Sequence, residues 1–202
     1  MNKNRLETIS DGIFVIVMTL LILDVKIPAN VPINSDTELL NALFEIKPKI
    51  ISFAVSFFII GGFVVGHHFI FSLVNKINGL FVWINILYLL TISFIPFPTS
   101  ILAENSDKFT ALCFYALNIM ICGSFHTLMF WLIYKNENLR KEDVKPADVK
   151  KYFLGGLFGT LSNVVAVLLG LISLNLGYII FVATPIYFII SRLLIEKKQV
   201  QL

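Results

Sequence analysis

The sequence predicts an all-α integral membrane protein, and three observations lead to that class. Hydrophobic side chains make up 57% of the 202 residues, charged side chains only 14%, and the mean hydropathy is +0.84. Soluble domains average about 45–50% apolar and about 25% charged residues. A chain of this size cannot bury so much apolar surface in one water-facing core, whereas a bilayer accommodates it. The composition therefore excludes a disordered chain, a nucleic-acid-binding domain and a disulfide-rich secreted module.

Apolar runs separated by short polar segments predict six membrane helices in a single domain, residues 1–202. Each run is long enough to span a bilayer, for which about 20 residues are needed. With the N-terminus in the cytoplasm, the cytoplasmic segments hold twelve of the sixteen Lys and Arg residues, as the positive-inside rule requires. We therefore predict an N-in, C-in topology. The predicted helices cover residues 10–27, 50–72, 79–102, 109–134, 152–174 and 177–195.

The first predicted helix differs from the others, because its uninterrupted apolar run, residues 12–23, is flanked by Asp11 and Asp24. So short a run is also typical of a signal-peptide core or an interfacial helix, but no cleavage site resembling A-x-A follows it. Polar residues inside a membrane span usually face the bundle interior or a water-filled path. We therefore expect this helix to line such a path.

One face of the first helix is an apolar stripe with a single hydroxyl near its middle. Helical periodicity brings together on that face Ile16, Thr19, Leu20 and Leu23. A simple packing stripe, with the threonine bonded to its own backbone, would give the same pattern. The stripe alone therefore leaves both interpretations open.

Polar residues gather at the cytoplasmic end of the same helix. Asp11 and the pair His67-His68 of the second helix should reach similar membrane depths, given a rise of about 1.5 Å per residue. A carboxylate, a guanidinium and imidazoles at one level would satisfy one another and fix the two helices together. The alternative is an interfacial histidine pair that reaches headgroup water. The residues of this predicted cluster are Arg5, Ser10, Asp11, His67 and His68.

Other polar or small residues inside the spans favour structural roles. Gly155 and Gly159 form a G-x-x-x-G motif, which we interpret as close packing within one chain rather than a subunit contact. Pro96 and Pro98 are expected to end or kink the third helix. Neither a Ser-His-Asp arrangement nor a metal-ligand set nor a phosphate-binding loop is recognisable, so we predict no catalytic residue and no metal site. Interhelical hydrogen bonds account for the amides Asn85, Asn118 and Asn163.

The segment RLETISDG, residues 5–12, resembles the R-x-x-x-F-S-D signature of the transmembrane-protein-175 potassium channels. This family is known from lysosomes and, as shorter single-repeat chains, from bacteria. The match continues through TLLILDVK at 19–26, His67-His68 followed by Phe71, and PFPT at 96–99. The signature departs from the family pattern at Ile9, a packing position where phenylalanine is usual.

The resemblance implies a potassium-preferring cation channel in the inner, or plasma, membrane of a bacterium. Family members form a pore on a four-fold or pseudo-four-fold axis, lined by the first helix of each repeat. They lack the TVGYG filter loop of ordinary potassium channels, which is also absent from this sequence. One repeat per chain then implies a homotetramer within the lipid bilayer. Potassium and other monovalent cations would be the permeant ions, with no cofactor and no nucleic acid partner.

The same resemblance assigns roles to residues of the first helix. Ile16 would be the main hydrophobic constriction and gate, with Leu20 and Leu23 as further apolar rings. Thr19 would present hydroxyls to a passing ion and give modest selectivity for potassium over sodium, while Asp24 would concentrate cations at the outer mouth. Residues of the signature would fix this helix to its neighbours rather than touch the ion: Arg5, Ser10 and Asp11.

Two other functions remain open from the residues alone. Asp11 with the pair His67-His68 also suits a proton-coupled transporter or a proton pathway. A membrane enzyme that uses Asp11 and His67 as an acid–base pair is a third hypothesis. Potassium flux and the oligomeric state distinguish the channel from these alternatives, because one first helix cannot enclose a pore.

Overall fold

The computed structural model describes residues 2–200, with the side chains of residues 188, 189 and 191–200 left out of the description. Over that range the chain is helical apart from its connecting loops and one isolated antiparallel bridge between Val74 and Arg140. The elements are α1 (Lys3–Leu20), η1 (Leu21–Asp24), α2 (Asp36–Glu45), α3 (Lys47–Leu73), α4 (Gly79–Phe94), α5 (Pro96–Glu104), α6 (Phe109–Lys135), α7 (Pro146–Gly170) and α8 (Leu174–Val200).

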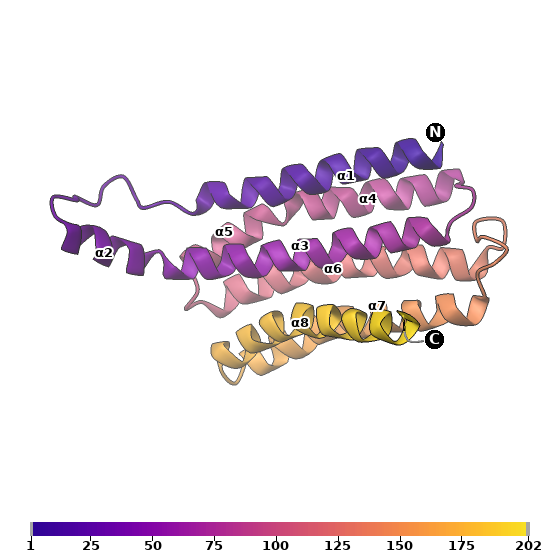
Figure 1. Ribbon diagram of the computed structural model, residues 1–202. Helices are drawn as coiled ribbons and strands as arrows, with labels where there is room; N and C mark the ends of the chain where they lie inside the picture. Colours follow the sequence, from indigo (N-terminus) through magenta and orange to yellow (C-terminus); the bar gives the residue numbers. More distant parts are fainter. Residues whose placement is uncertain (1, 201–202) are drawn as a thin grey trace.

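The long helices run side by side in one bundle (Figure 1). α1 and α4 lie on one side, α7 and α8 on the other, and α3 and α6 between them. The buried core follows this arrangement, since α3, α4 and α6 contribute most of its large side chains. The prediction of an all-α membrane protein is confirmed.

Five helical segments in the described chain are long and apolar enough to cross a membrane: 3–24, 47–73, 79–104, 109–135 and 146–170. α8 contributes a shorter apolar stretch, Leu174–Tyr187, so the sixth span stays a prediction. The first turn of α1 and the last turn of α8 lie at the same end of the bundle, which an even number of crossings requires (Figure 1). The N-in, C-in topology also stays a prediction, and three of its basic side chains, Arg192, Lys197 and Lys198, lie outside the described residues.

Several predicted helix boundaries are wrong by a turn or more. The first helix begins at Lys3, because the Asn2 side chain caps it by accepting a 2.9 Å hydrogen bond from the Arg5 amide. Its α-helical part ends at Leu20 and a 3-10 turn continues to Asp24, four residues before Pro28. The turn between the last two helices lies at residues 171–173, whereas the predicted helices leave residues 175–176 for it. There Gly170 and Gly177 let the hairpin close tightly, since a β-carbon at Gly177 would lie 2.9 Å from the Ala166 carbonyl oxygen.

α2 is an additional helix that hydropathy does not reveal. Ser35 caps it by accepting from the Glu38 amide at 3.2 Å, and the Glu38 carboxylate accepts from the Asn34 amide at 2.6 Å. This exchange resembles the capping-box pattern S-x-x-E, which the sequence contains at residues 35–38. α2 projects beyond the end of the bundle (Figure 1), which fits its mixture of acidic and apolar residues.

The third predicted helix is divided at its prolines, as expected. α4 ends at Phe94 and α5 begins at Pro96, which has no amide hydrogen to continue the helical ladder. The Ile95 amide bonds to the Ile92 carbonyl at 3.0 Å, a tightened turn. Thr99 then donates its hydroxyl to the Ile95 carbonyl at 2.8 Å, so the PFPT segment satisfies the backbone at its own kink.

Close packing between α6 and α7 uses small residues one position away from the predicted motif. A β-carbon on Gly156 would lie 2.5 Å from Thr127 Oγ1, and one on Gly123 would lie 2.7 Å from Thr160 Oγ1. Nothing lies within 4 Å of a β-carbon at Gly155. The interpretation as packing within the chain therefore holds for Gly156 and Thr160, and it is wrong for Gly155.

The amides inside the spans behave in two ways. Asn118 donates from Nδ2 to the Thr91 carbonyl of α4 at 3.4 Å, an interhelical hydrogen bond as predicted. Asn163 instead donates to the Gly159 carbonyl of its own helix at 3.0 Å, so the prediction of an interhelical bond is wrong there. A side chain that short reaches the carbonyl one turn back more easily than a neighbouring helix.

Candidate functional site

α1 has one buried face and one uncovered face. The uncovered face carries the stripe predicted from periodicity: Ile16 is 58% exposed, Leu20 42% and Leu23 63%. Gly12 and Thr19 are exposed on the same side. Since these residues recur at spacings of three and four, a continuous side of the helix contacts no other part of the described chain closely. The buried face consists of Leu6, Ser10, Phe14, Val17 and Leu21.

Thr19 lies halfway along the uncovered face. Its hydroxyl donates to the Ile16 carbonyl at 2.8 Å and approaches the Val15 carbonyl at 3.1 Å. The hydroxyl hydrogen is therefore used within the helix, as in the packing interpretation. The oxygen keeps lone pairs that can accept from water or contact a cation.

Asp24 ends the 3-10 turn at the opposite end of α1 from Arg5. Its side chain is half-buried, and its backbone carbonyl accepts from the Lys26 amide at 3.0 Å. Within the described residues the Asp24 carboxylate forms no ion pair, with Lys26 or with any other base. Its negative charge is available at this end of the helix.

A buried polar chain fixes the opposite end of α1 to α3 and α4. Asn85 donates from Nδ2 to Ser10 Oγ at 3.0 Å, and Ser10 donates its own hydrogen to the Leu6 carbonyl at 2.9 Å. The Asn85 Oδ1 atom lies 2.8 Å from His67 Nε2. Because the amide nitrogen of Asn85 is used as a donor, Oδ1 must accept, which puts the histidine proton on Nε2. Ser10, Asn85 and His67 are each 0% exposed.

Asp11 meets the second histidine. Its Oδ1 lies 3.0 Å from His68 Nε2, and the two side chains are 40% and 53% exposed. A pair this exposed contributes about 0–1 kcal/mol to stability. The contact between Asp11 and His68 agrees with the expectation that Asp11 and the histidine pair lie at one depth.

Arg5 is not part of that cluster within one chain. Its guanidinium is exposed and forms no ion pair with any residue that the structure describes. Asn85 completes the cluster, although the sequence predicts for it only an interhelical hydrogen bond and not its partners. The signal was present: Asn85 lies one and a half turns into an apolar helix, where an amide needs a partner.

These side chains do not form a metal centre. Among the described residues, no group of three or more His, Cys, Asp or Glu side chains could hold a metal ion. The arrangement gives α1 an N-terminal half that is hydrogen-bonded to α3 and α4, and a long uncovered apolar face beyond it. The class of protein is therefore a multi-pass helical membrane protein whose first helix is fixed on one side and uncovered on the other.

Comparison with known proteins finds similarity to one family. The family model for the endosomal/lysosomal potassium channel TMEM175 matches residues 5–96, which include α1 and the polar cluster. The crystal structure of a lysosomal potassium-selective channel TMEM175 homolog from Chamaesiphon minutus has a TM-score of 0.82 and 29% identity. That similarity covers 94% of this chain and 97% of the other. Over residues 5–96 the chain therefore matches the TMEM175 family, and the structural similarity extends over nearly the whole chain, in agreement with the resemblance seen in its sequence.

The curated relatives match a smaller region. A potassium channel of Chamaesiphon minutus is 41% identical over 100 residues, 50% of this chain and 49% of that protein. The endosomal/lysosomal proton channel TMEM175 of Gallus gallus is 36% identical over 113 residues, 54% of this chain and 23% of that protein. The matched region spans about half the length of the bacterial relatives. The bacterial relatives, together with the five long apolar helices, indicate a multi-pass protein of the plasma membrane.

Proposed function

We propose that this chain forms a potassium-preferring cation channel as a homotetramer, with α1 of each subunit lining the pore. The observation that carries the proposal is the uncovered face of α1, which bears Ile16, Leu20 and Leu23 between polar ends. Four such faces around an axis would cover one another and enclose a path. The names of the bacterial relatives, which are potassium channels, support the same function. The proposal requires no cofactor and includes no enzymatic activity.

The narrowest part of the proposed pore is a ring of four Ile16 side chains. A narrow apolar neck excludes water, and with it a hydrated ion, so the pore can close by dewetting. Leu20 and Leu23 would extend the apolar path toward the outer end. Opening requires the four helices to spread or rotate. The buried contacts between Ser10, Asn85 and His67 would keep the inner ends in register while this happens.

Selectivity in this pore is modest, because no ring of backbone carbonyls replaces the hydration shell. Thr19 oxygens would contact a partly dehydrated cation next to the constriction. Potassium loses its water more readily than sodium, so potassium is favoured. Four Asp24 carboxylates at the outer mouth would raise the local concentration of cations of either kind.

The test is potassium current through the purified protein in a planar bilayer. Ile16→Ala should raise the current severalfold, because a wider neck is easier to wet. Val15→Ala is the matched control: Val15 is 62% exposed on the same helix but points about 100° away from Ile16. Equal currents from both variants, or a strictly monomeric protein by native mass spectrometry, would refute the assignment of the pore face.

A proton pathway is the second candidate function. It is favoured by the 3.0 Å contact between Asp11 and His68, and by the Gallus gallus relative, which is named a proton channel. A proton pathway predicts flux that Asp11→Asn abolishes and that needs no potassium. The channel predicts potassium current that survives Asp11→Asn with altered gating.

A further inference from the structure

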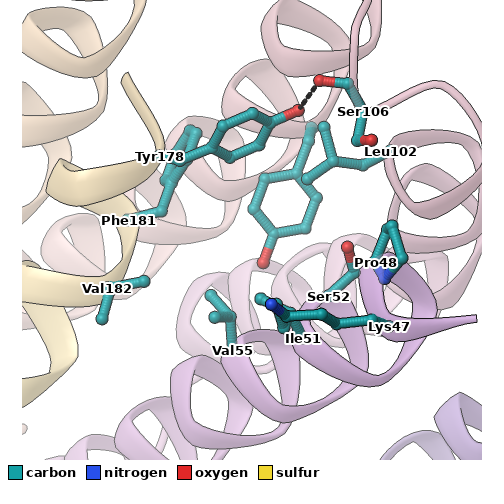
Figure 2. Close-up of a pocket in the computed structure, with 11 residues that line it drawn as sticks. Lys47, Pro48, Ile51, Ser52, Val55, Leu102, Ser106, Tyr178, Phe181 and Val182 are labelled. Carbon is teal, nitrogen blue, oxygen red and sulfur yellow. Dashed lines mark hydrogen bonds between the residues drawn. The ribbon is translucent and has the colours of Figure 1, made fainter. Parts of the chain in front are cut away.

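A hollow opens on the side of the bundle away from α1, between α3 and α8. Its volume is about 340 Å³, within the roughly 300–1,000 Å³ range of small-molecule sites. Ile51 on α3 and Val182 on α8 remain 49% and 41% exposed at its edges, so it opens sideways toward the membrane. Leu102 and Phe181 are buried deeper in its wall (Figure 2).

Both tyrosine hydroxyls in the wall of this hollow are already hydrogen-bonded. Tyr178 donates its hydroxyl to the Ser106 carbonyl at 2.9 Å (Figure 2). The Tyr115 hydroxyl is bonded to Ser56 at 2.9 Å. The rings of both tyrosines therefore present carbon atoms to the hollow, so its wall suits a hydrocarbon occupant.

The mouth of the hollow carries a positive charge. Lys47, the first residue of α3, extends its side chain along the helix toward Ile51, with its nitrogen beside the hollow (Figure 2). Two lysines close by in the sequence are paired: Lys49, two residues further along α3, with Glu104 at 3.4 Å, and Lys108, two residues after the wall residue Ser106, with Asp107 at 2.6 Å. Lys47 forms no ion pair within the described residues.

We propose that the hollow binds one acyl chain of an anionic phospholipid, with the phosphate of that lipid at the Lys47 ammonium. The apolar wall matches a hydrocarbon chain, and the unpaired ammonium at its mouth matches a phosphate held at the depth of the headgroups. A neutral detergent or a zwitterionic lipid supplies the chain but no net negative charge. The site lies on the opposite side of the bundle from the face of α1, and it does not depend on what α1 conducts.

The experiment measures which lipid the intact protein retains in nanodiscs of phosphatidylglycerol and phosphatidylcholine with identical acyl chains. Native mass spectrometry of the released protein should show bound phosphatidylglycerol in preference to phosphatidylcholine. Lys47→Gln should lower that preference about fivefold, the effect of one lysine near a membrane surface. Lys108→Gln removes the same charge from the same end of the bundle, where an aspartate already neutralises it, and should leave the preference unchanged.

A second variant tests the hollow itself. Ser52→Phe, on the α3 side of the wall, should reduce retention of both lipids without altering their ratio (Figure 2). Three results would overturn the proposal: no preference in the wild type, an equal loss of preference in Lys47→Gln and Lys108→Gln, or stronger retention of added oleate than of phosphatidylglycerol. Dissociation of the oligomer by Ser52→Phe with lipid retention intact would also overturn it, because a second copy of the chain would then fill the hollow.

Discussion

Replacement of Asn85 by leucine tests whether the buried polar chain fixes the N-terminal half of α1 to its neighbours. Leucine is close to asparagine in shape, so the change removes hydrogen bonds while leaving little cavity. In the structure Asn85 bridges Ser10 on α1 and His67 on α3, and all three side chains are fully buried. The substitution leaves the His67 Nε2 proton without its acceptor.

The expected loss of stability follows from that one orphaned donor. A buried polar group left without a partner costs about 1–3 kcal/mol. Ser10 adds little to this, because its hydroxyl still donates to the Leu6 carbonyl. We therefore expect Asn85→Leu to lower the free energy of unfolding by about 1–3 kcal/mol. In Asn118→Leu a single long bond of 3.4 Å is lost, so the loss should be smaller.

Reversible unfolding in mixed detergent micelles, followed by circular dichroism, measures these differences. The double variant Asn85→Leu/His67→Leu removes both partners of the central bond, and should recover part of the loss since no donor is then orphaned. Equal stability of Asn85→Leu and the wild type would refute the reasoning. So would a double variant whose loss is the simple sum of the two single losses, because the two residues would then act independently.

Three further predictions concern packing and conduction. Gly156→Ala should be about 1–3 kcal/mol less stable than Gly155→Ala, because both variants gain helix propensity but only the β-carbon at position 156 would lie 2.5 Å from Thr127 Oγ1. Thermal unfolding measures the difference, and equal stabilities of the two variants would contradict the prediction. Thr19→Ala should bring the potassium and sodium permeabilities together, which reversal potentials under bi-ionic conditions measure; an unchanged ratio would remove Thr19 from the selectivity proposal. Asp24→Asn should lower single-channel conductance at low ionic strength and much less at high salt, because salt screens the field of the outer mouth. A salt-independent loss of conductance would assign Asp24 another role.

The sequence predicts the parts of this fold that depend on bilayer thickness and helix periodicity. Apolar length locates the spanning segments, and the three- and four-residue spacing identifies the uncovered face of α1. Hydropathy fails where local chemistry decides the structure. α2 depends on the cap formed by Ser35 and Glu38, and α1 begins early because Asn2 caps it. Mean hydropathy over a window of about twenty residues does not reveal such capping residues.

The sequence likewise predicts only part of the polar cluster. Membrane depth alone brings Asp11 to the level of the two histidines, as the structure has them. Depth does not say which histidine meets which partner, because neighbouring residues on a helix point about 100° apart. That angle sends His67 inward to Asn85 and His68 outward to Asp11. Only the packing of α4 beside α1 and α3 brings Asn85 within reach of both Ser10 and His67.

The uncovered face of α1 differs chemically from the other uncovered faces of the bundle. Exposed leucine and phenylalanine on α7, such as Leu154 and Phe158, need no protein partner, because lipid is as apolar as they are. On α1 the exposed apolar residues share their face with groups that lipid cannot fully satisfy: the Arg5 guanidinium near the start of the helix and the Thr19 oxygen near its end. Such groups require water or another protein surface at that depth. The polar residues on this face, rather than its leucines, are therefore what make α1 the candidate to line a water-filled path.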